Sequence, residues 1–430
     1  MRITLHYGTA KVPIEVPEDN LSGLIVPRQE QADKARNTQI LSETLQTPCF
    51  PEFQKIIQEH RLCVLLADAT RDLPTADCLN AVVPQLKSCS AVQFILCTGT
   101  HTAQTKENLS LCRLVQKICN ENGLCNFEVF IHDCQTARLL DAGLTSRGTH
   151  VCYNAAAENA DVFLVFSDIK PHYFAGYSNP VKNFVPGICD YETARGNHSL
   201  TLDAASTFCA HPWHSNPAQQ NQPLAADQVE AMEKITKSRP VYALTTISSH
   251  QAIQWAAFGP IRDVCQKAFG QTDEWNLHTV KPVERLIVSP GGFPNDMDLY
   301  IAQRALELTE QAILNGGEIL FVSACQHGIG PEKSLEYFWN LLIRPFDEIY
   351  RAIEGEYKLF SHKPYRFARL IQRLRKLWVY SELPDDQVVA AHMTPADSPQ
   401  KVIDGWLKES PAVKILIIDG ANKLALRAYS

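Results

Sequence analysis

The chain has 430 residues, of which 45% are hydrophobic and 20% charged, so it is long enough for two domains with packed cores. Its formal net charge is -7 and it has no long basic run, which argues against a nucleic-acid or anionic-membrane partner. Long apolar runs, such as 162–166 and 415–418, have only the length of strands, so the sequence predicts no membrane-spanning helix.

The predicted elements begin with a hairpin, because residues 1–16 alternate apolar and polar side chains and break at Tyr7-Gly8-Thr9. This pattern differs from the charged head and apolar core of a secretion signal. A series of strands and helices follows: strand 61–67, turn 68–74, helix 76–86, strand 92–97, helix 105–120, strand 127–131 and strand 162–167. Strands that alternate with helices are typical of a parallel sheet covered on both faces.

A second series begins after the polar stretch 271–282, with strand 285–289, helix 299–315, strand 317–324 and strand 413–419. The fold class is therefore predicted as α/β, with two domains built on mainly parallel sheets that are flanked by helices. Residues 1–279 would form an N-terminal cofactor-binding and catalytic domain, and residues 280–430 a C-terminal α/β domain that closes over the site. Ligands of such sheets bind at the carboxyl ends of strands, so we expect the active site in the cleft between the domains.

Two short polar segments follow predicted strands. In the segment 68–71 (DATR), Arg71 is suited to hold a carboxylate by two parallel hydrogen bonds. The alternative is that Asp68 caps the next helix and Arg71 is exposed. In the segment 98–101 (TGTH), Gly99 permits close approach of the backbone to a ligand, and His101 is of a residue type suited to proton transfer.

The segment 167–200 is too irregular for one helix and carries many functional groups, which indicates a loop that brings them into a cleft. Lys182 lies among apolar neighbours and is a candidate nucleophile, or else a solvated loop lysine. His172 and His198 are candidate ligands or proton carriers, or else structural histidines held by hydrogen bonds.

Together these segments resemble the nickel-pincer lactate racemase family, over nearly the whole chain. The matching pieces are DATR at 68–71, GTH at 99–101, PHYFAGYS at 171–178 with Lys182, VPG at 185–187, NH at 197–198 and SPGGFPNDMDLYIAQRAL at 289–306. The resemblance implies a nickel-pincer nucleotide, a pyridinium mononucleotide whose two sulfur-containing arms and one ring carbon hold nickel. Lys182 matches the lysine that forms a covalent thioamide with one arm, and His198 matches the protein ligand of the nickel.

The same resemblance implies a racemase or epimerase that acts on a small 2-hydroxy acid by reversible hydride transfer to this cofactor. His101 and His172 match the two acid/base residues, one on each face of the substrate. Arg71 matches a contact to the substrate carboxylate, and Asp68 a residue that supports it. Maturation would need the cofactor-synthesis enzymes, and we expect protein made in a host without them to lack the cofactor.

The chain departs from the family at two places. Asn179-Pro180 replaces a glycine pair before the tethered lysine, and proline restricts the backbone there. Ile301 and Arg304 stand where the family's lactate racemases carry a glutamine and a lysine that face the substrate. Both are candidate substrate-binding residues, and they predict a substrate other than simple lactate.

Three alternatives stay open. The first is a noncatalytic or cofactor-carrying relative that has lost racemase activity. Against it, the chain retains all four of the side chains that the reaction needs: His101, His172, Lys182 and His198. A nicotinamide-dependent dehydrogenase would need a GxGxxG turn, which is missing. A zinc hydrolase would need more than the HPWH of 211–214, which favours a structural role for these histidines. The fourteen cysteines form no CxxC pair, and we expect reduced thiols in a cytoplasmic protein.

Overall fold

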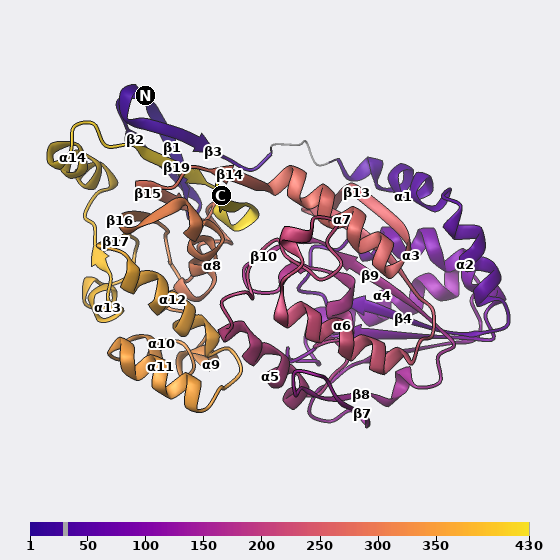
Figure 1. Cartoon of the computed structure of the whole chain (residues 1–430). Coiled ribbons are helices and arrows are strands. Elements are labelled where there is room, and N and C mark those ends of the chain that lie inside the picture. The colour runs from indigo at the N-terminus through magenta and orange to yellow at the C-terminus, as the bar shows by residue number, and fades with distance from the viewer. Residues whose placement is uncertain (29–32, 430) are drawn as a thin grey trace. The chain divides into compact units, whose positions relative to one another are not determined.

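The structure, a computed structural model, describes residues 1–28 and 33–429. Contacts between Cα atoms divide the chain into two compact units. Of the described residues, 33–274 form one unit, and 1–28 together with 275–429 form the other. We call them the middle unit and the terminal unit and describe each by itself (Figure 1).

The sheet of the middle unit contains six strands in its described part, parallel except for the last, which is antiparallel to its neighbour. Their spatial order is β6 (Phe127–Ile131), β5 (Ala91–Cys97), β4 (Arg61–Ala67), β9 (Val162–Asp168), β12 (Val241–Ser249) and β13 (Ala252–Pro260). Runs of β-branched and aromatic residues form these strands because parallel strands are buried on both faces. The strands predicted at 61–67, 92–97, 127–131 and 162–167 are confirmed to within one residue.

Helices of the middle unit cover its sheet (Figure 1). They are α1 (Asn37–Leu45), α2 (Cys49–Ile57), α3 (Thr75–Val82), α4 (Lys106–Glu121), α5 (Tyr191–Ser199), α6 (Pro223–Thr236) and α7 (Ile261–Asn276). Alternate residues of the strands, such as Val64, Phe94 and Leu164, pack with residues of α2, α3 and α4 in one continuous core. A hairpin, β7 (Leu139–Leu144) and β8 (His150–Asn154), lies outside the sheet.

The terminal unit has a sheet whose six described strands are all parallel. Their order is β18 (Thr394–Pro395), β17 (Lys376–Tyr380), β16 (Ile313–Val322), β15 (Val283–Ser289), β19 (Ile415–Asp419) and β3 (Leu21–Ile25). The helices of this unit are α8 (Leu299–Thr309), α9 (Glu332–Leu335), α10 (Trp339–Leu342), α11 (Phe346–Gly355), α12 (His362–Arg373), α13 (Asp385–Ala390) and α14 (Pro399–Glu409). A further parallel pair is β14 (Leu277–Val280) with β20 (Ala425–Ala428).

Two expectations need correction. The first 28 residues belong to the terminal unit and not to an N-terminal domain, because β3 pairs with β19 across nearly 400 residues of sequence. The predicted hairpin, β1 (Arg2–Tyr7) with β2 (Ala10–Glu15), forms and packs on the same sheet, where His6 Nδ1 lies 2.7 Å from Asp419 Oδ2. The helix expected over 299–315 ends at Thr309, because the chain enters β16 at Ile313.

The second unit boundary, between residues 274 and 275, lies close to the expected position near 280. None of the helices in the described residues is both long and apolar enough to cross a bilayer. The α/β class with parallel sheets flanked by helices is confirmed.

Candidate active site

Three loops of the middle unit converge because their strands are neighbours. Strands β9, β4 and β5 are adjacent and parallel, so their carboxyl ends meet at one edge of the sheet. The DATR segment follows β4, the TGTH segment follows β5, and the segment that carries His172 follows β9. This arrangement is the usual place for a ligand site in a parallel sheet.

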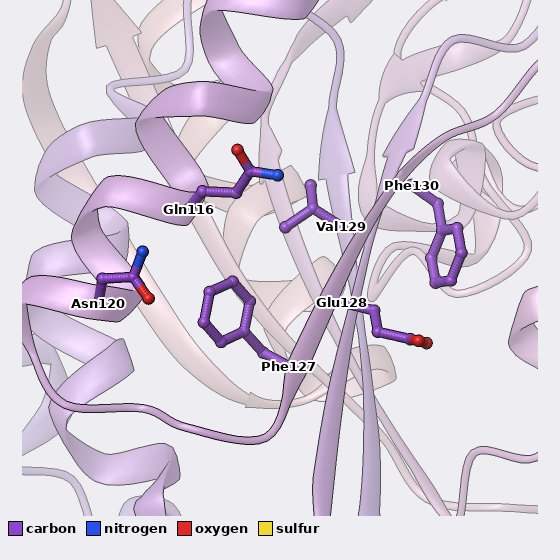
Figure 2. A pocket seen from close by; sticks show the side chains of 6 residues that line it. All are labelled: Gln116, Asn120, Phe127, Glu128, Val129 and Phe130. Carbon is purple, nitrogen blue, oxygen red and sulfur yellow. The ribbon is translucent and has the colours of Figure 1, made fainter.

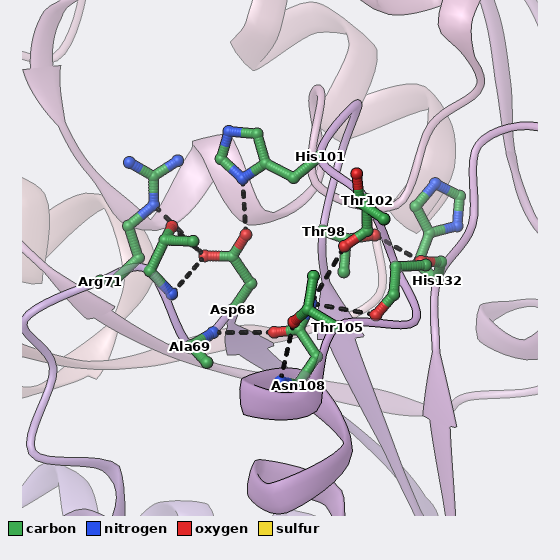
Figure 3. Close-up of polar contacts among 11 residues, drawn as sticks. Asp68, Ala69, Arg71, Thr98, His101, Thr102, Thr105, Asn108 and His132 are labelled. Atoms are coloured by element: carbon green, nitrogen blue, oxygen red, sulfur yellow. Dashed lines mark hydrogen bonds and ion pairs between the residues drawn. The ribbon is translucent and has the colours of Figure 1, made fainter. Parts of the chain in front are cut away.

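The first two loops are joined by a buried carboxylate (Figure 3). Asp68 Oδ2 lies 2.6 Å from Nδ1 of His101, and Asp68 Oδ1 accepts a hydrogen bond of 2.6 Å from the Thr70 hydroxyl. The Arg71 Nε atom lies 3.7 Å from Asp68 Oδ1. The Asp68 side chain is 1% exposed, whereas those of His101 and Arg71 are 43% and 47% exposed. The carboxylate is therefore positioned to orient two accessible functional groups.

The charge state of Asp68 follows from competing effects. Burial raises the pKa of this carboxyl group, but the hydrogen bond with His101 and the positive charge of Arg71 outweigh burial and leave the pKa below its usual value. Asp68 is thus ionised at neutral pH. A carboxylate at Nδ1 fixes the imidazole tautomer with its proton on that atom, and the other nitrogen, Nε2, points away from Asp68 and can accept a proton (Figure 3).

A residue that the sequence analysis missed holds both loops. Asn108, on the first turn of α4, is 2% exposed. Its Oδ1 atom accepts a hydrogen bond from the Ala69 amide, and its Nδ2 atom donates to the carbonyl oxygens of Thr102 and Ala103 (Figure 3). The spacing of Thr105, the N-cap of α4, and Asn108 is a capping signal, but sequence does not show that the amide bridges two loops.

The third loop begins as a short hairpin, β10 (Lys170–His172) with β11 (Gly176–Ser178). A Cβ atom at Gly176 would lie 1.7 Å from the Ala210 carbonyl oxygen, and its φ is +73°, so glycine is required there. His172 Nδ1 accepts a hydrogen bond of 3.3 Å from the Ala175 amide. The ring of Phe174 meets the His172 ring edge-on, with 4.5 Å between the ring centres.

Lys182 lies in a short 3₁₀ helix, η5 (Pro180–Asn183), whose position is set by its neighbours. Asn179 caps this helix, since its Oδ1 atom accepts from the Val181 amide, and Pro180 occupies the first helical position. Asn183 donates to the carbonyl oxygens of Leu65 and Phe166, at the ends of β4 and β9. The departure at Asn179-Pro180 therefore provides an ordered start for the lysine segment.

Lys182 and His198 share an aromatic neighbour with His172. The Lys182 Nζ atom lies 5.9 Å from the centre of the Phe174 ring, and the His198 ring centre lies 5.6 Å from it. His198 occupies the last turn of α5, and this helix is capped by Asp190. Phe174, which was not among the predicted site residues, thus contacts three of them.

The Lys182 amine and the His198 imidazole both favour their neutral forms. Burial, followed by the charges of Arg71 and Lys170, lowers the pKa of Lys182 to about 7. Burial, followed by the charge of Lys182, lowers the pKa of His198 to about 3. At neutral pH the site therefore presents a lysine amine that is partly unprotonated beside an uncharged imidazole, a pair suited to nucleophilic attachment and to metal ligation.

The structure brings together six of the eight predicted site residues. Asp68 contacts His101 and Arg71, the charge of Arg71 acts on Lys182, and His172, Lys182 and His198 share the ring of Phe174. We refer to the predicted residues among these as the six candidate residues: Asp68, Arg71, His101, His172, Lys182 and His198. Ile301 and Arg304 lie on α8 of the terminal unit, where Arg304 Nε donates to the Ile301 carbonyl oxygen. The role of Ile301 and Arg304 in substrate binding, together with the six candidate residues, stays a prediction.

The histidines of the HPWH segment have structural surroundings. His211 and His214 are buried, and each accepts a backbone hydrogen bond through Nδ1, from Trp213 and Asn216 respectively. Both rings contact Phe269. All fourteen cysteines are free thiols.

A shallow depression of about 520 Å³ lies elsewhere in the middle unit, between α4 and the edge strand β6 (Figure 2). It is lined by Gln116, Asn120 and residues 127–130. Among these only Glu128 is ionisable, so the depression lacks the paired proton carriers and nucleophile that the six candidate residues provide.

Comparison with known proteins identifies relatives along the whole chain. A family model described as the lactate racemase N-terminal domain matches residues 7–208. A lactate racemase from Thermoanaerobacterium thermosaccharolyticum is 24% identical over 345 residues, which are 78% of this chain and 77% of that protein. A lactate racemase from Lactiplantibacillus plantarum is 22% identical over 438 aligned residues, covering 97% of each chain.

Solved structures show the same fold. The structure of the lactate racemase apoprotein from T. thermosaccharolyticum aligns with a TM-score of 0.80 at 21% identity, over 99% of this chain and all of that chain. A crystal structure of a protein from Thermotoga maritima aligns with a TM-score of 0.61 at 13% identity, over 94% and 100% of the two chains. Fold and loop arrangement thus define an α/β protein with a polar site at the carboxyl edge of a parallel sheet. Residues 7–208 match the model of the lactate racemase N-terminal domain, and nearly the whole chain is similar in sequence and fold to lactate racemases.

Proposed function

We propose that this protein is an isomerase that racemises or epimerises a 2-hydroxy acid with the help of a nickel-pincer nucleotide bound to Lys182. The observation that carries the proposal is the convergence of the six candidate residues, above all the contact of His172, Lys182 and His198 with one Phe174 ring. Similarity to lactate racemases, including the match to their N-terminal domain model, supports the reaction class.

The residues present fit this cofactor. An amine whose pKa is about 7 is a competent nucleophile at neutral pH, as a covalent link through Lys182 requires. His198 stays uncharged, so its imidazole has an electron pair to offer to nickel. When bound, the nucleotide supplies an acceptor for the hydrogen on carbon 2 of the substrate.

The chain's own residues perform the remaining tasks. Nε2 of His101, held by Asp68, takes the hydroxyl proton of one enantiomer, and His172 serves the opposite face. Inversion needs one proton carrier on each side of the reacting carbon, which explains why two histidines are required. Arg71 binds the substrate carboxylate through its guanidinium group. On α8, Ile301 and Arg304 select the rest of the substrate, and we infer that simple lactate is not preferred.

The decisive experiment uses protein co-produced with the cofactor-synthesis enzymes, the maturation partners that we propose for it in the cytoplasm. Intact-mass measurement should show one covalent adduct, which K182A lacks. Loaded protein is then incubated in heavy water with a panel of enantiopure 2-hydroxy acids, and the products are separated by chiral chromatography. The α-hydrogen is expected to survive inversion, whereas exchange through a carbanion would place deuterium at that carbon.

The results also test the alternative of a noncatalytic relative. An adduct without turnover on any acid of the panel would favour a cofactor-carrying protein that has lost activity. Tight binding of a nicotinamide nucleotide with nickel-independent turnover would contradict both the proposed racemase and the noncatalytic relative.

A further inference from the structure

The hairpin β7–β8 of the middle unit carries, on one face, three side chains of the types that can bind a metal ion: Asp141, His150 and Cys152. Asp141 and Cys152 are direct partners across the strands, so their side chains lie on the same side of the hairpin. His150 precedes Cys152 by two residues on β8 and shares that side. The Asp141 backbone is adjacent to an irregularity in the register, where the Gly143 amide donates to Asp141 Oδ1.

The donor atoms lie close together. His150 Nε2 is 2.9 Å from Asp141 Oδ1, and the nitrogen, the sulfur and a carboxylate oxygen all lie within 4.8 Å of one another. In a tetrahedral zinc site the corresponding separations are about 3.5 Å, given the usual zinc–ligand bond lengths. The Asp141 and His150 side chains are 62% and 54% exposed. Both can therefore rotate and bring their donor atoms to the separations that a zinc site requires.

We propose that Asp141, His150 Nε2 and Cys152 Sγ bind one divalent transition-metal ion of the zinc type, with water in the fourth position. One imidazole nitrogen, one thiolate and one carboxylate oxygen form a donor set that zinc accepts. These three residues are not among the six candidate residues, and the proposed metal site does not depend on the racemase activity.

Electrostatics explains why a cation is favoured there. The carboxylates of Asp141 and Asp190 place negative charge near the Cys152 thiol. A bound divalent cation offsets these negative charges. The binding step is then an exchange in which the Cys152 S–H bond breaks, a sulfur–metal bond forms and one proton is released to solvent.

The hairpin is also attached to α5, the helix that carries His198. The Cys152 amide donates to Thr193 Oγ1 over 2.9 Å, and the Thr193 hydroxyl donates to the His150 carbonyl oxygen over 2.8 Å. The Asp190 amide donates to the Cys152 carbonyl oxygen. A metal ion would therefore stabilise the hairpin on which the first turn of α5 rests, and it should raise the thermal midpoint of the protein.

Cobalt(II) titration of protein made without the pincer nucleotide tests the site, because cobalt bound to a thiolate gives an ultraviolet charge-transfer band. We expect a band that saturates at one equivalent, is removed by zinc and is accompanied by release of one proton. C152S should abolish the band, and H150Q and D141N should each weaken cobalt binding at least tenfold.

Two controls separate this site from other thiols and from the candidate nickel ligand. C125S removes an exposed cysteine outside the hairpin, and H198A removes the candidate nickel ligand; both should retain the full band. Thermal melts without metal show whether C152S folds, and zinc should raise the midpoint of the parent but not of C152S. No thiolate band in the parent, or an unchanged band in folded C152S, overturns the proposal.

Discussion

Asp68 illustrates how a single buried side chain prepares two exposed ones. Its carboxylate is almost completely covered, yet it lies 2.6 Å from His101 Nδ1 and 3.7 Å from Arg71 Nε. A buried carboxylate is retained in the ionised form only when such partners compensate for lost hydration. The same interactions hold the two groups that we assign to proton transfer and substrate binding.

The first prediction concerns this carboxylate. D68N should lower kcat by about 10²–10⁴-fold, because the amide can no longer fix the His101 tautomer. It should also destabilise the fold by about 1–3 kcal/mol at neutral pH. The Asp68 pKa is depressed in the folded state, so this stabilisation is present above the ordinary pKa of about 3.9 and is lost as the pH falls through the depressed value.

Urea unfolding of both proteins at several pH values measures the stability difference. The difference between parent and D68N should shrink on the acid side. A constant difference at all pH values would contradict the role of the ionised carboxylate.

The second prediction concerns Lys182. In protein without the cofactor, the rate at which an amine-specific reagent modifies this residue should follow a pKa of about 7, because burial and nearby cations disfavour the ammonium form. R71Q removes one of those cations and should shift the profile to higher pH. Peptide mass spectrometry identifies the modified lysine. A profile centred near 10.4, the ordinary lysine value, would mean that the amine is solvated.

At the scale of elements, the site depends on how the ends of three strands are held. Asn108 links α4 to the loops that follow β4 and β5, and Asn183 links η5 to the ends of β4 and β9. These buried amides satisfy backbone groups that loops would otherwise leave unpaired. The loops thus acquire the rigidity that proton transfer between fixed groups requires.

The third prediction tests this linkage. N108A should lower stability by about 1–3 kcal/mol, because the Ala69 amide and two carbonyl groups lose a buried partner. It should also reduce kcat, since the His101 loop becomes less ordered. N120A, an exposed position on the same helix, is the matched control and should change neither quantity. Equal effects of the two variants on stability would show that the loss comes from α4 and not from the loops.

At the scale of the whole molecule, the chain begins and ends in one unit and places the six candidate residues in the other. The terminal unit contributes α8, which begins at an Asp298 cap and carries Ile301 and Arg304. Next to them, Lys363 from α12 donates to the Tyr300 carbonyl oxygen. We propose that this region of the terminal unit determines which hydroxy acid is accepted.

The fourth prediction follows from that proposal. The double variant I301Q/R304K restores the residue types of the family's lactate racemases, so kcat/KM for lactate should rise about tenfold relative to that for the parent's preferred acid. Chiral chromatography with both substrates measures the ratio. Cofactor loading, read by intact mass, should be unchanged. An unaltered ratio in a loaded, folded variant would show that α8 does not select the substrate.

Local sequence was sufficient for four strands of the middle-unit sheet and for the polar loops that follow them, but it did not predict β12, β13 or β17. Continuous apolar runs predicted β4, β5, β6 and β9 almost to the residue, since a strand buried on both faces admits few polar side chains. The order of strands and polar loops then indicated that Asp68, His101 and the segment with Lys182 lie at one edge. Motif resemblance added the roles of individual residues.

Only the tertiary structure decided how those residues act on one another. The hydrogen bond between Asp68 and His101, the contact of Phe174 with His198 and the linkage by Asn108 join residues that are distant in sequence. The pairing of β3, near the N-terminus, with β19, near the C-terminus, is also a contact that only the tertiary structure shows. Burial and charge at a site depend on the sum of such contacts, and a one-dimensional pattern records the residues but not the neighbours that set their pKa values.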